Sequence, residues 1–432
     1  MIKERLSLDI MVGTNIENEE SVIIKGADRR SHTLINASNR SGREEAFILP
    51  MIQQDLKKVA NYTLKQTPVL TYDEDELYLN GITIIESTNE LCQESWKLAN
   101  KYGIPDKAIT YINPLDPNTP SINPMRGEVD KVVRVLTQIV EDYYGVSDNA
   151  NILVQRDHLK HYIYLLKLHD KNKDVTLDML LDMYNNPRVV RTMHESLKTM
   201  IPERIDRIED REKRNYWKIV KGVDYWFNSN LVLKKNKSGM VSFVQYDESG
   251  LEVYEDVKAE QISGLKTILN DIGTNQKLRR VLFGTTDFDF DKHLKSGGIL
   301  LINTAKHELG ELSGVLGKIV LMNLQNSTFN RELNSPTYHH IIVDELPKYI
   351  YPSFLDFPVA AGKLNVFLTV LQQTDVKRFG QDYQDMLNTN LRNRITHDSV
   401  FDVWKADIIV NNKSLRIAHL KPDFFETVYS HS

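Results

Sequence analysis

The chain has 432 residues, of which 41% are hydrophobic and 26% charged, and its formal net charge is −5. This composition is typical of a folded globular protein, and the length predicts two or three structural units. The excess of acids excludes a basic field over the whole surface, so nucleic-acid binding would have to come from a local patch. The single cysteine, Cys92, excludes an internal disulfide framework and is interpreted as a packing residue.

The sequence contains no run of about 18 or more apolar residues. Residues 1–10 have the features of neither a signal peptide nor a membrane anchor. We therefore expect a cytoplasmic protein.

Residues 1–125 predict the first part of an α/β domain. Short apolar strands alternate with stretches of helical periodicity, and the run Gly81–Glu86 is typical of a strand buried on both faces of a parallel sheet. This alternation favours a doubly wound sheet. The expected strands are Ser21–Lys25, a short strand that begins at His32, Gly81–Glu86 and Ile109–Ile112, and the expected helices are Met51–Leu64 and Leu91–Tyr102.

A damaged phosphate-binding loop follows the strand that begins at His32. The strict pattern is G-x-x-x-x-G-K-[ST], in which backbone N–H groups hold phosphates, the Lys reaches the β and γ oxygens, and the hydroxyl binds Mg²⁺. Only the second Gly of the pattern is intact. The candidate cofactor-binding residues are Ala37 in the place of the first Gly, Ser38, Asn39, Arg40, Ser41, Gly42 as the second Gly, Arg43 in the place of the Lys and Glu44 in the place of the hydroxyl.

Residues 126–275 change to helical periodicity and predict a mainly α-helical inserted domain. Within it, Arg211–Trp226 mixes basic and aromatic residues, which is compatible with contact to a nucleic-acid backbone or with a solvated helix whose aromatics pack inward. His158 and His161 lie three residues apart on an expected helix. No Glu or Cys ligand is obviously supplied nearby, so we do not predict a metal site there.

Residues 276–432 return to the α/β pattern, with expected strands at 297–303, 340–345 and 366–371. The middle strand ends in Asp344 and Glu345, as in nucleotide-hydrolysing enzymes where the first acid holds the Mg²⁺ shell and the second polarises water. Gln372 and Gln373 follow the next strand, where such motors carry a sensor of the γ-phosphate. We take these four as candidate catalytic residues and Asp344 as the candidate metal ligand. The alternatives are a solvated acidic turn and a strand end capped by amides.

The ordered set of segments resembles the type IV secretion coupling proteins, the conjugative DNA-transfer ATPases of bacteria, in their Gram-positive branch. The segments that carry the resemblance span nearly the whole chain. They are Ile24–Arg29 with His32–Leu34, Ile48–Leu56, Gly81–Glu86, Leu278–Leu282, Asp289–Leu294, Gly297–Leu300, Leu309–Leu312, Ile342–Pro347 and Asn388–Asn393.

This resemblance implies a RecA-like P-loop sheet interrupted by an all-α domain, with residues 276–432 supplying the Walker B strand. It further implies a hexameric ring that moves single-stranded DNA, with a relaxase and secretion-channel proteins as partners, at the inner face of the cell membrane. Its cofactors would be ATP and Mg²⁺. The sequence departs from the family's pattern in two further features. It lacks the N-terminal membrane anchor usual in the family, and the segment Glu86–Glu90 replaces the Pro-Lys-Gly-Asp-like turn that is frequent there.

The altered loop residues predict weak or absent ATP hydrolysis. The planar fork of Arg43 does not copy a compact ammonium. A carboxylate at Glu44 about 4 Å from a phosphate oxygen costs roughly 4 kcal/mol at intermediate dielectric, equivalent to roughly a thousandfold in affinity. Three hypotheses follow: a motor that tolerates the divergent loop, an inactive paralogue that acts as a structural or regulatory subunit, and a translocase of double-stranded DNA.

Overall fold

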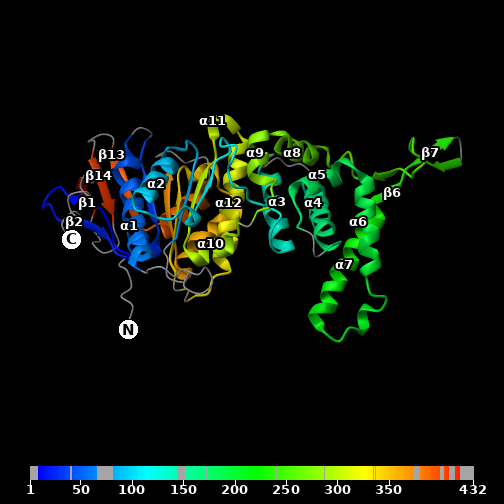
Figure 1. Ribbon diagram of the computed structural model, residues 1–432, viewed down its shortest axis with the longest axis horizontal. Helices are drawn as coiled ribbons and strands as arrows, with labels where there is room; N and C mark the ends of the chain where they lie inside the picture. The colour runs from blue at the N-terminus through cyan, green and yellow to red at the C-terminus, as the bar shows by residue number, and fades with distance from the viewer. Residues whose placement is uncertain are drawn as a thin grey trace. The chain divides into compact units, whose positions relative to one another are not determined.

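The structure is a computed structural model that describes residues 8–38, 41–65, 81–143, 151–170, 174–238, 241–286, 288–333, 335, 337–372, 380–398, 403–407 and 414–418. The chain divides into two compact units (Figure 1). The sheet unit comprises residues 1–120 and 287–432, and the helical unit comprises residues 121–286. Among the helices in the described ranges, none has the length and hydropathy that crossing a bilayer requires.

The sheet unit contains an 11-stranded sheet in the order β2-β1-β15-β14-β13-β3-β12-β11-β4-β10-β5. Neighbours from β13 to β5 pair in parallel, and Ile342 and Val343 lie opposite Ile84 and Ile85. The expected mainly parallel sheet, interrupted by a helical insertion, is confirmed. Its strands are β1 (Ile10–Asn15), β2 (Ser21–Ile24), β3 (Thr33–Asn36), β4 (Gly81–Glu86), β5 (Ile109–Ile112), β10 (Ile299–Asn303), β11 (His339–Val343), β12 (Val366–Gln372), β13 (Asn393–Asp398), β14 (Val403–Asp407) and β15 (Ser414–Ala418).

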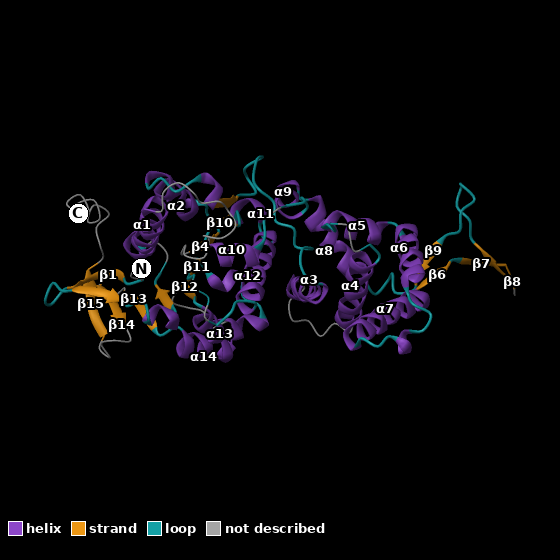
Figure 2. Ribbon diagram, turned by 60° about the horizontal axis from the view of Figure 1, so that its bottom comes forward, coloured by secondary structure: helices purple, strands orange, loops and turns teal. Residues whose placement is uncertain are grey.

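Helices cover both faces of the parallel strands. Figure 2 shows α1 and α2 on one face and α12, α13 and α14 on the other. The chain enters α1 through a π-helical turn, Glu44–Ile48, whose wider spacing places Phe47 and Ile48 inward against the sheet. The helices of this unit are α1 (Leu49–Lys65), α2 (Glu90–Lys101), α10 (Phe290–Ser296), α11 (Lys306–Leu309), α12 (Leu312–Phe329), α13 (Asp356–Ala361) and α14 (Gly380–Asn390).

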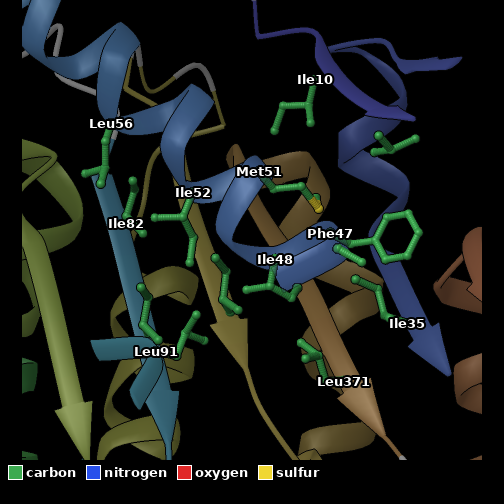
Figure 3. Packing of buried hydrophobic residues seen from close by; sticks show 14 of the residues in the cluster. Ile10, Ile35, Phe47, Ile48, Met51, Ile52, Leu56, Ile82, Leu91 and Leu371 are labelled. Atoms are coloured by element: carbon green, nitrogen blue, oxygen red, sulfur yellow. The ribbon is translucent and has the colours of Figure 1, made fainter. Parts of the chain in front are cut away.

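The apolar core beneath α1 fixes the start of this helix against the sheet. Side chains of the π-helical turn and α1 interdigitate with strand residues (Figure 3). Phe47 packs edge to face against Trp404, with ring centroids 4.5 Å apart. Packing against the sheet therefore fixes Phe47, which follows the phosphate-type loop. The labelled residues are Ile10, Ile35, Phe47, Ile48, Met51, Ile52, Leu56, Ile82, Leu91 and Leu371.

A buried ion network adds a polar tie between α1 and the sheet. Arg29 donates two hydrogen bonds to the Asp55 carboxylate, at 2.9 and 2.7 Å, and His340 Nδ1 lies 2.9 Å from Asp55 Oδ2. Burial alone would raise the pKa of Asp55. The charge of Arg29 and the hydrogen bonds from His340 and Arg29 outweigh it and hold this pKa well below its usual range.

The helical unit is formed mainly by helices that pack around α4, with two small antiparallel ribbons, β6–β9 and β7–β8, following α7. These ribbons lie between Leu231 and Asp256. The elements are α3 (Val129–Tyr143), α4 (Asn151–Leu168), α5 (Leu177–Asn185), α6 (Pro187–Met200), α7 (Arg211–Asn230), β6 (Leu231–Leu233), β7 (Lys235–Ser238), β8 (Val241–Val244), β9 (Tyr254–Asp256), α8 (Ser263–Thr274) and α9 (Gln276–Leu282).

Replacing Gly317 with Ala in α12 is expected to destabilise the protein by about 1–3 kcal/mol through overpacking. A Cβ at this position would lie 2.2 Å from Cδ1 of the Tyr349 ring, which is fully buried and whose hydroxyl lies 2.8 Å from Thr304 Oγ1. Urea unfolding measures the effect. Gly222→Ala in α7 is the matched control, because no heavy atom lies within 4 Å of the added Cβ. Equal effects of the two substitutions would contradict this packing.

Candidate nucleotide site

The candidate site lies where β3, β12, β11 and β4 end at the same edge of the parallel sheet. Ala37 follows β3 and is buried, and its N–H donates to Gln372 O at 3.2 Å. Asp344 follows β11 directly, and its N–H donates to Ile85 O at 2.9 Å. The topology therefore brings the loop, the first acid and Gln372 to one place. Asn39, Arg40 and Gln373 lie outside the described residues.

Arg43 turns its guanidinium inward, toward the strand ends. The side chain is buried, and its Nη2 donates to Asp344 Oδ1 at 3.1 Å. Its Nη1 donates to two backbone carbonyls, Ala37 O at 3.3 Å and Gln372 O at 3.4 Å. The guanidinium thus has hydrogen-bond acceptors at three strand ends. These contacts stabilise its positive charge inside the protein.

None of the other loop residues in the described ranges supplies a second cation for a phosphate. Gly42 adopts a φ of +72°, which suits glycine, and its carbonyl accepts the Ala46 N–H at 2.8 Å. Ser38 is exposed, and the Ser41 hydroxyl oxygen is buried without a hydrogen-bond partner. The Glu44 carboxylate, in the place of the metal-binding hydroxyl, lies 3.8 Å from Arg43 Nε. Burial raises the pKa of Glu44, against the attraction of Arg43.

The second acid, Glu345, is engaged by neighbours. Its backbone adopts φ +53°, and its carboxylate accepts the Ser87 hydroxyl at 3.1 Å and forms an ion pair with Lys348. Burial alone would raise the pKa of Glu345, but the hydrogen bond and charge of Lys348 and the hydrogen bond of Ser87 lower it overall. A carboxylate with a lowered pKa is a weaker base for activating water.

Gln372 and Glu86 are also held by structural contacts. The Gln372 side-chain carbonyl accepts the Tyr383 hydroxyl at 3.1 Å, and Gln372 is buried. Glu86 ends β4, is buried, and accepts the Thr88 hydroxyl at 2.9 Å and the Cys92 N–H in the first turn of α2. Lys348 and Tyr383 are parts of the site that the sequence did not predict, whereas Glu86 belongs to the segment that the resemblance places near the site. The spacing of Glu345 and Lys348, three residues apart, was a signal for one of them.

Three further carboxylates lie near the ion pair between Arg43 and Asp344. Burial raises the pKa of Asp344 to about 7, against the attraction of Arg43, and the nearby carboxylates of Glu44, Glu345 and Glu86 add to this rise. Within the described ranges, no three His, Cys, Asp or Glu side chains are grouped so that they could hold a metal ion. The residues present at 37–38 and 41–44 therefore do not fit a tightly bound Mg-ATP, since their cation is already paired and the metal-binding hydroxyl is missing.

The buried Asp344 is expected to make the unfolding free energy fall as pH rises from about 4 to 7. Because its pKa is raised to about 7 in the folded protein, the folded state binds more protons than the unfolded state across this window. Asp344→Asn removes this titration, so its stability should depend less on pH than that of the unmodified chain. Urea unfolding at pH 5 and pH 7 measures both proteins, and parallel pH dependences would contradict the raised pKa.

Of the comparisons with known proteins, only the one with solved structures found similar proteins. No family model and no curated protein matches the chain. Among solved structures, VirB4 of Thermoanaerobacter pseudethanolicus has a TM-score of 0.51 at 12% identity, covering 97% of this chain and 98% of that one. The plasmid coupling protein TrwB, in complex with a non-hydrolysable ATP analogue, has a TM-score of 0.50 at 13% identity, covering 92% and 80%.

At these identities the likeness concerns the fold alone. The chain has a RecA-like α/β fold with an inserted helical unit, and it shares this fold with VirB4 and with the plasmid coupling protein TrwB. The fold expected from the sequence resemblance is thereby confirmed.

Proposed function

We propose that this chain is a coupling-protein-like subunit of a bacterial conjugation or type IV secretion machinery, and that it binds ATP and Mg²⁺ weakly or not at all. The observation that carries the proposal is the buried ion pair between Arg43 and Asp344. In it, the group in the place of the phosphate-binding Lys contacts the acid in the place of the magnesium ligand. The guanidinium thus supplies internally the positive charge that a metal would bring to Asp344.

The electrostatics of the site support the same conclusion. A triphosphate entering beside Glu44 would meet a carboxylate where related loops offer a hydroxyl, at a cost of roughly 4 kcal/mol at intermediate dielectric. It would also compete with Asp344 and two carbonyls for the Arg43 guanidinium. The role we favour is therefore structural or regulatory: a subunit that keeps the fold of the transfer ATPases and docks DNA or an active partner.

The proposed partners are those that the sequence resemblance to the coupling proteins implies. They are single-stranded DNA, a relaxase and secretion-channel proteins, in a ring that this chain forms alone as a hexamer or joins as a subunit. The place of action would be the cytoplasm, at the inner face of the cell membrane through these partners. The TrwB structure that shares this fold is a complex with a non-hydrolysable ATP analogue, which is the reason to test nucleotide binding here.

A second candidate function is a motor that tolerates the divergent loop. The observation in its favour is the acid pair, Asp344 and Glu345, which follows β11 beside the loop as it does in nucleotide-hydrolysing enzymes. In this alternative, ATP would displace Arg43 from Asp344 on binding.

A hydrolysis assay distinguishes the two candidates. Phosphate release is measured with Mg-ATP, with and without single-stranded DNA, for the unmodified chain and for Asp344→Asn, which sets the background. We expect equal release from both proteins. Turnover on the order of 1–100 s⁻¹ that disappears in Asp344→Asn would establish the motor and overturn the proposal.

A further inference from the structure

One face of α7 carries a line of cations. Arg211, Arg214, Lys218, Lys221 and Tyr225 follow one another at intervals of three or four residues, which places them on one side of a helix with 3.6 residues per turn. We call these five residues the α7 basic face. The helix packs against α4 and α6, within the helical unit (Figure 1).

The acids of α7 lie off this face. Glu212 is one position, about 100°, round the helix from Arg211. Asp224 is turned toward α6, where its Oδ1 lies 2.8 Å from His194 Nε2 and also accepts the Asn228 amide at 3.0 Å. The carboxylate of Asp210, just before the helix, accepts the Lys213 N–H as an N-cap. These acids therefore have local structural partners or point elsewhere.

The cations of the α7 basic face are available to a ligand. Arg211 and Lys218 are exposed, and neither forms an ion pair with a carboxylate in the described part of the chain. Arg214 donates to Ile208 O at 2.8 Å, which orients its guanidinium without neutralising it. Tyr225 is 59% exposed, and Lys221 Nζ lies 5.6 Å from the centre of its ring. An exposed aromatic ring therefore stands beside the line of charges.

We propose that the α7 basic face binds the sugar–phosphate backbone of a single-stranded nucleic acid, with a base stacked on Tyr225. From Arg211 to Lys221 the helix advances about 15 Å, enough for several consecutive phosphates. Unpaired cations along a track combined with an exposed ring are the features that single-strand binding requires. A net charge of −5 makes this face a local exception rather than part of a general basic surface. The choice of DNA as the nucleic acid rests on the proposed function. The α7 basic face is the surface that we propose contacts this DNA.

The test is fluorescence anisotropy with a labelled oligo-dT and the full chain, without nucleotide, over a range of salt concentrations. The variant Arg211→Gln, Lys218→Gln, Lys221→Gln removes three cations from the face. We expect it to bind at least tenfold more weakly, and the slope of log K against log salt to shrink by about 2, since each phosphate contact on a single strand contributes roughly 0.7. Tyr225→Ala should weaken binding roughly tenfold without changing this slope.

The matched control is Lys213→Gln, Lys295→Gln, Lys363→Gln, which removes the same charge from three exposed lysines elsewhere, one of them on another face of α7. It should bind like the unmodified chain. Equal weakening by both triple variants would overturn the proposal, as would absence of binding by the unmodified chain. Equally effective competition by poly-glutamate would assign the face to an acidic protein instead. None of these outcomes depends on Arg43, so failure here is separable from failure of the proposed function.

Discussion

Replacing Ala37 with Gly, Arg43 with Lys and Glu44 with Thr together is expected to raise the affinity for Mg-ATP by roughly a thousandfold. The Gly relieves crowding where the backbone meets phosphate, and the Lys restores a compact ammonium. The Thr removes a carboxylate and supplies a metal ligand. Lysine also cannot reproduce the fork by which Arg43 contacts Ala37 O, Gln372 O and Asp344 at once, so Asp344 becomes free for Mg²⁺.

No single member of this set is expected to suffice. Arg43 and Glu44 act on one electrostatic network with Asp344, and effects within such a network are not additive. Titration calorimetry of the triple variant and the three single variants measures the coupling. Asp344→Ala in the triple variant should abolish any recovered hydrolysis. The claim of coupling fails if Glu44→Thr alone recovers as much affinity as the triple change, and the idea of a decayed nucleotide site fails if the triple change recovers none.

Asp55→Ala is expected to lower the unfolding free energy by about 3–5 kcal/mol, because it leaves Arg29 buried and without its carboxylate. Arg29 also donates to Leu8 O and lies over the Phe367 ring, so the cation cannot move to solvent without losing packing. Urea unfolding measures the loss. The matched control is Glu94→Ala, which removes an ion pair whose side chains are half exposed and should cost less than about 1 kcal/mol.

The lowered pKa of Asp55 makes the stabilisation by this network depend on pH. Because the pKa is lower in the folded protein, the stabilisation is present above the ordinary carboxylate pKa and is lost as pH falls below it. The unmodified chain should therefore lose more stability than Asp55→Ala between pH 5 and pH 3. Two results would contradict a stabilising ion network between α1 and the sheet. One is an equal loss of unfolding free energy by the unmodified chain and Asp55→Ala between pH 5 and pH 3, and the other is a destabilisation by Asp55→Ala no larger than that by Glu94→Ala.

The parallel strands were predictable because both of their faces are buried. In β4, β10, β11 and β12 the continuous apolar runs are a direct consequence of helices on both sides of the sheet. In the antiparallel part only β2 was predicted as a strand, and none of the antiparallel pairings was predicted. Strands such as β15 are short and mixed in polarity, and β15 pairs with β1 from the other end of the chain, so no local pattern marks the pairing.

The same contrast holds for the site. The loop position and the acid after β11 follow from strand ends, which sequence patterns can locate. Arg43 turns inward because three acceptors lie close together: the carbonyls of Ala37 and Gln372 and the carboxylate of Asp344. These acceptors are far apart in the sequence, and only the assembled sheet brings them together. The ion pair of Glu345 could be predicted from local sequence, because its partner Lys348 follows it by three residues.

The central claim is that Arg43, paired with Asp344, closes the nucleotide site of this chain. Calorimetric titration of the unmodified chain with Mg-ATP tests it most directly. We predict no measurable binding, which corresponds to a dissociation constant weaker than about 1 mM, or less than about 4 kcal/mol of binding free energy. Saturable binding at micromolar Mg-ATP, abolished by Asp344→Ala, would contradict the claim.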